Sequence, residues 1–160
     1  MRVDGLKRAY NITDFSAAEN QTKFENEVQG YKEAQNGKTY NNLMHYVNKG
    51  RVMLFFVENG EILMMYDTLK NRAESFDMTA FTQRNGPIQA IQRYNSYILI
   101  QFKHVIELFD FEKKSIFNVL SRISMAQEIL DAQPDTTVSR FLYVQSERQI
   151  YLYDCDTMHN

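Results

Sequence analysis

One pattern of residues occurs three times in this chain of 160 residues. Each copy is an apolar run, a short polar break and a second apolar run that ends in an aromatic residue followed by aspartate. The copies are VMLFFVENGEILMMYDTLKN, YILIQFKHVIELFDFEKKS and FLYVQSERQIYLYDCDTMH. Their aspartates are Asp67, Asp110 and Asp154, so the unit is about 43 or 44 residues long. This period predicts four-stranded, mainly antiparallel units repeating between Leu43 and Asp154.

The unit that begins at Gly86 divides into strands at its turn signals. GPIQAIQRY follows Asn85-Gly86-Pro87 and is predicted to be an inner strand. SYILIQF is a continuous apolar run, typical of a central strand buried on both faces, whereas VIELFDF is expected to have one wetter face. SIFNVL then serves as the outer strand. In the preceding unit, Glu58-Asn59-Gly60 predicts the hairpin between the two apolar runs.

Two segments have helical spacing of their apolar residues. SIFNVLSRISMAQEILDAQ predicts a short helix within residues 118–132, with an extended conformation as the equally supported alternative. Residues 16–35 could form a second helix with a thin apolar stripe. Nearer the N-terminus, GLKRAYNITDF is a candidate fourth copy of the second apolar run, with Asp14 at the matching place and a polar insertion over residues 21–42.

The unit resembles the WD repeat and its degenerate relatives, among them the citron-homology propellers and the propellers of vesicle-tethering and ciliary-transport scaffolds. The resemblance covers roughly residues 43–158 and, more weakly, the first fifteen. The third strand of a WD repeat usually ends in Trp-Asp, and here the pairs are Tyr66-Asp67, Phe109-Asp110 and Tyr153-Asp154. The Gly-His pair that usually opens a repeat is missing, with Gly86-Pro87 near its place. The resemblance implies an all-β fold of propeller-type blades with one or two short helices inserted.

The predicted blades make up an incomplete ring. Residues 1–42 are interpreted as a partial blade plus the polar insertion, and the blades follow at about 43–85, 86–132 and 133–160. This is about three blades of material, whereas propellers usually close with four or more. An open stack leaves apolar faces and strand edges exposed at both ends. We therefore expect the terminal blades to pack against a longer version of the chain or another subunit, and the isolated chain to aggregate or dimerise.

Composition excludes several classes of protein. The net charge of -2 argues against electrostatic binding to nucleic acid or to an anionic membrane surface. A single cysteine, Cys155, allows no intrachain disulfide and favours a reducing compartment. No apolar run approaches the roughly 20 residues that span a bilayer. The sequence thus predicts an intracellular, cytoplasmic protein, with the nucleus as an alternative compartment, and no membrane span.

The residue types that carry chemistry do not form a recognisable motif. His45, His104 and His159 stand singly, and Cys155 has no neighbouring His or Lys to activate it. The three repeat aspartates are expected at turns on separate blades, where they accept backbone N–H bonds. No glycine-rich phosphate loop or G-x-S-x-G elbow is present. We expect no catalytic residues, no bound metal or cofactor, and no small-molecule substrate.

The preferred interpretation is a non-catalytic scaffold that binds other protein subunits in a hetero-complex or within a longer propeller protein. The inter-blade segments Asn71–Asn85 and Asp131–Ser139 are candidate contact loops. An enzyme would need polar groups converging on a central channel, where the inner strand offers Gln89, Gln92 and Arg93. The other alternative is a complete small β-barrel or α+β domain, similar to an oligonucleotide-binding fold, acting as a nucleic-acid-binding or complex-assembly subunit.

Overall fold

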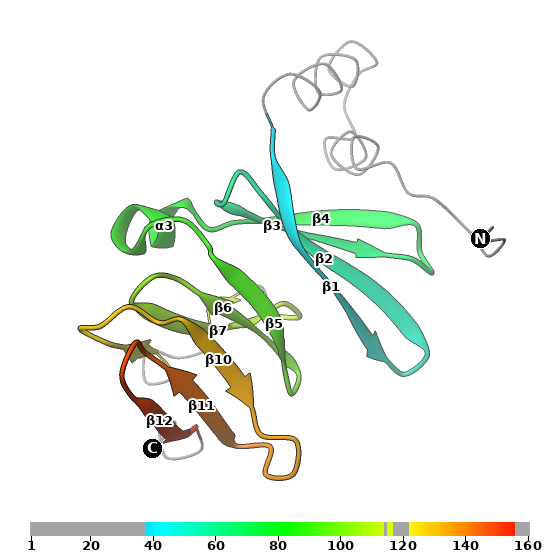
Figure 1. Ribbon diagram of the computed structural model, residues 1–160. Coiled ribbons are helices and arrows are strands. Elements are labelled where there is room, and N and C mark those ends of the chain that lie inside the picture. Colours follow the sequence, from blue (N-terminus) through cyan, green and yellow to red (C-terminus); the bar gives the residue numbers. More distant parts are fainter. Residues whose placement is uncertain (1–37, 114, 117–121, 156–160) are drawn as a thin grey trace, which may run out of the picture.

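The computed structural model describes residues 38–113, 115–116 and 122–155, and these form three antiparallel sheets (Figure 1). Sheet A contains β1 (Tyr40–Asn48), β2 (Arg51–Glu58), β3 (Ile62–Asp67) and β4 (Arg72–Asp77) in this order. Sheet B contains β5 (Ala90–Tyr94), β6 (Tyr97–Gln101), β7 (Val105–Asp110), β8 (Ser115–Ile116) and β9 (Ile123–Ser124), of which β8 and β9 both pair with β7. Sheet C contains β10 (Asp131–Pro134), β11 (Phe141–Gln145) and β12 (Ile150–Asp154). The helix α3 (Thr79–Asn85) connects sheet A to sheet B.

The predicted fold class is confirmed at the level of mainly antiparallel β-structure. The three sheets do not close into a barrel, so the small-barrel alternative is wrong for the part of the chain described. The first apolar run of each copy forms the second strand of a sheet, namely β2, β6 and β11. The second run forms the third strand, and Asp67, Asp110 and Asp154 are the last residues of β3, β7 and β12.

Two hairpins of sheet A turn through residues with positive φ. Lys49 and Gly50 have φ of 52° and 77°, and Asn59 and Gly60 have φ of 54° and 69°. Paired positive φ values characterise the tight turn whose twist matches that of antiparallel strands. Gly60 is further constrained, since a Cβ added there would lie 3.1 Å from the Cβ of Pro87. The hairpin predicted at Asn59-Gly60 is confirmed.

The core is divided into layers between the sheets. Phe55, Leu63 and Phe76 of sheet A pack against Ile98, Phe109 and other residues of sheet B. The opposite face of sheet B, which includes Leu99, Ile106 and Leu108, packs against Leu142 and Val144 of sheet C. The rings of Phe76 and Phe109 meet edge to face, with 4.9 Å between their centroids. Sheet B is therefore the middle layer.

Strand β7 is buried along its whole length, which corrects the expectation of one wetter face. Val105 and Phe109 face sheet A, and Ile106 and Leu108 face sheet C. Even Glu107 is only 1% exposed, and its carboxylate accepts a hydrogen bond from Arg122, the residue before β9. The glutamate in this strand predicted a solvent-exposed face. A strand inside the middle layer, however, has neighbouring sheets on both faces.

The predicted helix within residues 118–132 is wrong for residues 122–132, which contain β9 and the start of β10; residues 118–121 lie outside the described residues. Its apolar residues Ile123 and Ile129 are buried between sheets B and C instead of lying along one helical stripe. Pairing of Ile123 with Ile106 adds a strand to β7, and this tertiary contact prevails over the local spacing.

The two candidate contact loops contain regular structure. The segment Asn71–Asn85 holds β4 and α3, and Asp131–Ser139 holds β10. The expectations for residues 1–15, 16–35 and His159 lie outside the described residues. Within the described part of the chain, no helix is long and apolar enough to cross a bilayer.

Candidate interaction surface

The repeat aspartates lie at turns, as expected, and on three different sheets. Asp67 Oδ1 accepts the backbone N–H groups of Leu69 and Lys70, at 3.0 and 3.2 Å. Asp110 Oδ1 accepts those of Glu112 and Lys113, both at 3.1 Å. The structural role predicted for these carboxylates is confirmed at both turns.

The inner-strand residues proposed for a catalytic channel instead join neighbouring sheets. Gln92 of β5 donates to the carbonyl of Ala132 in β10. Arg93 donates to the carbonyl of Val47 in β1, at 3.3 Å, and its guanidinium lies over the Tyr46 ring, 4.3 Å from the centroid. These polar groups are used to hold the first strands of the three sheets together.

The histidines and the cysteine do not gather into a site among the described residues. His45 is exposed on β1, and His104 Nδ1 lies 3.0 Å from the carbonyl oxygen of Gln127. Cys155 is buried, and its backbone N–H donates to the carbonyl of Arg140. Within residues 38–113, 115–116 and 122–155, no three His, Cys, Asp or Glu side chains are placed to share a metal ion.

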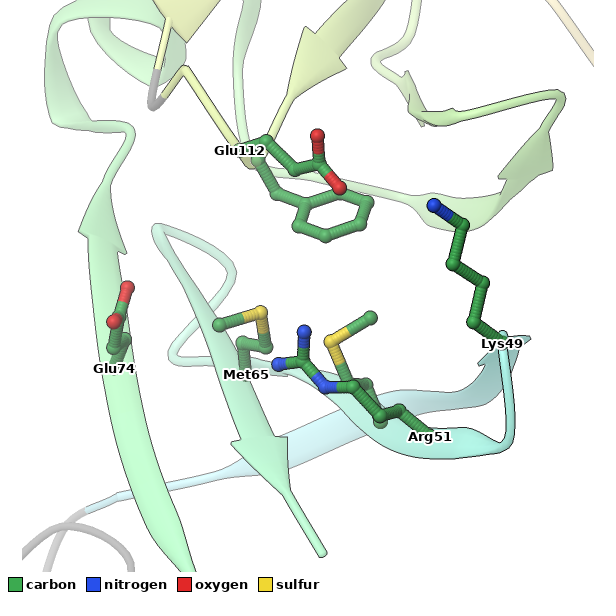
Figure 2. Close-up of a pocket in the computed structure, with 7 residues that line it drawn as sticks. Lys49, Arg51, Met65, Glu74 and Glu112 are labelled. Atoms are coloured by element: carbon green, nitrogen blue, oxygen red, sulfur yellow. The ribbon is translucent and has the colours of Figure 1, made fainter. Parts of the chain in front are cut away.

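A pocket of about 380 Å³ opens between sheets A and B (Figure 2). Its floor is apolar, and its rim carries charges of both signs; the lining residues are Lys49, Arg51, Met53, Met65, Glu74, Phe111 and Glu112. In Figure 2, Glu74 lies on one side of the pocket and Lys49 on the other, with Glu112 above Arg51 and Met65. The charged lining residues are two cations, Lys49 and Arg51, and two carboxylates, Glu74 and Glu112.

Arg51 in this pocket forms an ion pair with Asp67 at the end of β3. Burial by itself would raise the pKa of Asp67, but the hydrogen bonds from Arg51 and from the Lys70 and Leu69 N–H groups outweigh it and hold the pKa below its ordinary value. The remaining guanidinium atom Nε of Arg51 is buried without a hydrogen-bond partner in the described structure. The pair thus serves to fasten the β1–β2 hairpin to the Asp67 turn.

The face of sheet C that points away from sheet B, here called the outer face of sheet C, carries exposed apolar side chains on two paired strands. Along β11, Leu142 and Val144 are fully buried, while Tyr143 between them is 39% exposed. Ile150 and Leu152 of β12 are 73% and 55% exposed. Leu152 pairs with Tyr143 and Ile150 pairs with Gln145, so the exposed apolar side chains are neighbours on one face.

Polar contacts border this apolar strip at one end of its strands. The Tyr143 hydroxyl donates to Asp135 Oδ2 at 3.1 Å, and this hydrogen bond, with the negative charge of Asp135, raises the pKa of Tyr143. At the same end of the strands, Arg140 lies over the Phe141 ring and pairs with Asp154 at 3.5 Å. An apolar centre with a polar rim is the usual composition of a protein–protein interface.

Strand β12 also differs from its counterparts β3 and β7. Each of those strands pairs on both sides, whereas β12 pairs only with β11 in the part of the chain that the structure describes. The sequence predicted exposed apolar faces at the ends of the stack but did not identify the residues of this one, because the apolar content of FLYVQ and IYLYD resembles that of the buried copies. The residue types gave no signal, because Gln145 in FLYVQ corresponds to the buried Gln101 in YILIQ.

No known protein family matches the chain, and a search of curated proteins found no match.

Proposed function

We propose that this chain is a non-catalytic protein–protein interaction scaffold, built of WD-like propeller blades and working within a larger assembly or a longer polypeptide. Its three sheets are the blades, and its partner is another β-sheet that packs face to face on the outer face of sheet C. The partner belongs to another protein subunit or to a further part of the same polypeptide.

The observation that carries this proposal is the exposure of Tyr143, Ile150 and Leu152 on a regular, paired strand surface. Sheet-on-sheet packing already buries two interfaces of this kind in the chain, between sheets A and B and between sheets B and C. A partner sheet repeats that packing once more. Covering what remains exposed of Ile150 and Leu152 contributes on the order of 1–2 kcal/mol for each side chain.

The enzyme alternative has less support, because its candidate channel residues Gln92 and Arg93 are used in contacts between sheets. A nucleic-acid-binding role also has less support. In the described part of the chain, the pocket carries charges of both signs, and the outer face of sheet C presents aliphatic side chains next to Tyr143. A face-to-face protein contact fits the exposed residue types best.

The proposal is tested by sedimentation velocity of the full chain over a range of concentrations. A second copy brings its own outer face of sheet C, so the wild-type chain is expected to associate as its concentration rises. The double variant Ile150→Lys with Leu152→Lys is expected to remain monomeric at the same concentrations, with an unchanged melting temperature.

The matched control is Leu43→Lys with Leu69→Lys, which adds the same charge at two leucines that are 72% and 74% exposed on sheet A. This control is expected to associate as the wild type does. A wild-type chain that stays a compact monomer at every concentration, and melts cooperatively without concentration dependence, would contradict the proposal.

A further inference from the structure

Sheets A and B each have a strand on the far side of their third strand, and sheet C has none there among the described residues. In sheet A, β4 pairs with β3 along its whole length. In sheet B, β8 and β9 pair with β7. Strand β12 is the counterpart of β3 and β7 but pairs only with β11, so it is an edge strand in the described part of the chain (Figure 1).

The open edge of β12 presents main-chain hydrogen-bonding groups. The N–H of Cys155 donates to the carbonyl of Arg140, just before β11, at 2.8 Å. In an antiparallel pair, alternate residues of a strand bond to the neighbouring strand, so residues at odd spacing from Cys155 point the other way. The N–H and C=O groups of Leu152 and Ile150 therefore point away from β11. An added strand can bond to these groups while the β11–β12 ladder stays intact.

A groove of about 270 Å³ lies beside this edge, and it is lined by Ser124, Met125, Ala126, Gln127, Tyr151 and Tyr153. Tyr151 and Tyr153 pair with Val144 and Leu142, whose side chains face sheet B. The groove therefore lies on the side of β12 that faces sheet B. It is smaller than the roughly 300–1,000 Å³ of a typical small-molecule site. A side chain of a strand added to β12 suits this space better than a separate ligand does.

Sheet A shows which side chains fit opposite the tyrosines of the groove. Strands β3 and β12 both end in Tyr-Asp, so Tyr66 corresponds to Tyr153. The fourth strand of sheet A places Ala73 opposite Tyr66 and Ser75 opposite Met64. Both are small residues. A strand beside β12 is therefore expected to present small side chains to the groove.

The other side of the added strand meets the exposed Ile150. Its counterpart in sheet A is Leu63, which pairs with Phe76 of β4. Phe76 is 8% exposed, whereas Ile150 without such a neighbour is 73% exposed. We propose that the edge of β12 binds an extended segment of another polypeptide, which pairs antiparallel with β12 as the fourth strand of sheet C. Its small residues enter the groove, and an apolar residue covers Ile150.

This proposal goes beyond the proposed function, because it concerns the edge of sheet C and not its outer face. Packing of a partner sheet on the outer face uses side chains. In strand addition, main-chain hydrogen bonds supply the affinity, and side chains on alternate positions supply the specificity.

The test uses a fluorescein-labelled free peptide with the sequence of residues 70–78, which contains β4. Fluorescence anisotropy measures its binding to the dilute full chain, and saturable binding is expected. Leu152→Pro removes the outward N–H at a place where an edge strand tolerates proline, and should weaken binding at least about tenfold. The matched control Leu152→Ala keeps the N–H and should bind within about threefold of the wild type.

A second pair of variants tests the groove without changing β12. Ala126→Phe fills the groove from an exposed position and is also expected to abolish saturable binding. Its control, Thr136→Phe, adds the same ring at an exposed position that does not line the groove. This pair keeps the test usable if circular dichroism shows that Leu152→Pro does not fold.

Three outcomes would overturn the proposal. They are no saturable binding to the wild-type chain, equal weakening by a variant and its matched control, and full binding by both Leu152→Pro and Ala126→Phe. Association through the outer face of sheet C is measured by sedimentation without the peptide, so either proposal can fail without the other.

Discussion

The outer faces of sheets A and C are built from similar residues and have opposite environments. On sheet A, Phe56, Met64 and Tyr66 are nearly inaccessible to water. On sheet C, Ile150 and Leu152 at corresponding strands are more than half exposed. Both faces belong to antiparallel sheets whose other side packs on sheet B. Similar residue types are therefore buried at one end of the stack and exposed at the other.

This difference teaches that residue type alone does not report burial at the end of a stack. Sheet B has neighbours on both sides, and even the acidic residue Glu107 is buried there beside Arg122. A sheet at either end depends on polypeptide outside the three sheets to cover its second face. Mutations on the two outer faces test this difference in burial.

The largest difference in free energy of unfolding is expected between two truncations, one of a buried side chain on the outer face of sheet A and one of an exposed side chain on the outer face of sheet C. Met64→Ala removes a side chain that is 1% exposed, and we expect it to lower the free energy of unfolding by about 2–5 kcal/mol. Leu152→Ala removes one that is 55% exposed and should cost about 0.5 kcal/mol or less. Urea denaturation followed by circular dichroism measures both.

Equal losses in the free energy of unfolding for Met64→Ala and Leu152→Ala would contradict the difference between the two faces. A small cost at Met64 would mean that the outer face of sheet A is not firmly covered in solution. A large cost at Leu152 would mean that the outer face of sheet C is already packed against something in the isolated chain.

The period of the sequence predicted the β-rich fold because strand pairing follows local patterns. Residue types and spacing predicted three of its features correctly. These are the hairpin at Asn59-Gly60, the turn aspartates Asp67 and Asp110, and the central strand β6. Each of these depends on residues close in sequence, or on a run whose apolar length indicates burial on both faces.

Contacts between distant segments could not be predicted in the same way. The spacing of Ile123, Gln127 and Leu130 indicated a helix, but β9 pairs with β7 and Ile129 fills the space between sheets B and C. Exposed end faces were expected from the incomplete ring, but the exposure of Ile150 in particular was not, because the apolar pattern alone does not reveal whether a neighbour covers a given residue. The candidate interaction surface thus became visible only with the stacking order of the sheets.

An intermediate difference in the free energy of unfolding is expected between substitutions of the repeat aspartates in sheets A and C. Asp67 pairs with Arg51 and accepts two backbone N–H bonds, and its side chain is 5% exposed. Asp67→Asn is expected to cost about 1–3 kcal/mol, because buried donors lose their charged acceptor. Asp154→Asn should cost less, since Asp154 meets Arg140 at 3.5 Å and both side chains are more exposed than those at Asp67.

Asp67 also makes the stability of the folded chain decrease as the pH falls in the acid range. The pKa of Asp67 in the folded chain lies below its ordinary value of 3.8, so the unfolded chain binds the proton more readily. The stability that Asp67 contributes is fully present above pH 3.8 and is lost as the pH falls below it through the folded pKa. Asp67→Asn should flatten the pH dependence of unfolding in this acid range, whereas an unchanged slope would show that the Arg51 pair has no part in it.

The smallest effect is expected at the Tyr143 hydroxyl on the open outer face of sheet C. Its hydrogen bond to Asp135, together with the charge of Asp135, raises the pKa of Tyr143 above 10.0. Asp135→Asn removes the charge and should bring this pKa back toward 10.0, as measured by NMR titration of the ring carbons. Asp131→Asn, which removes a carboxylate from the same sheet without a contact to the hydroxyl in the described structure, serves as the control. A Tyr143 that titrates identically in all three chains would show that its ring is turned away from Asp135, and the polar rim of the outer face of sheet C would then lose one of its fixed contacts.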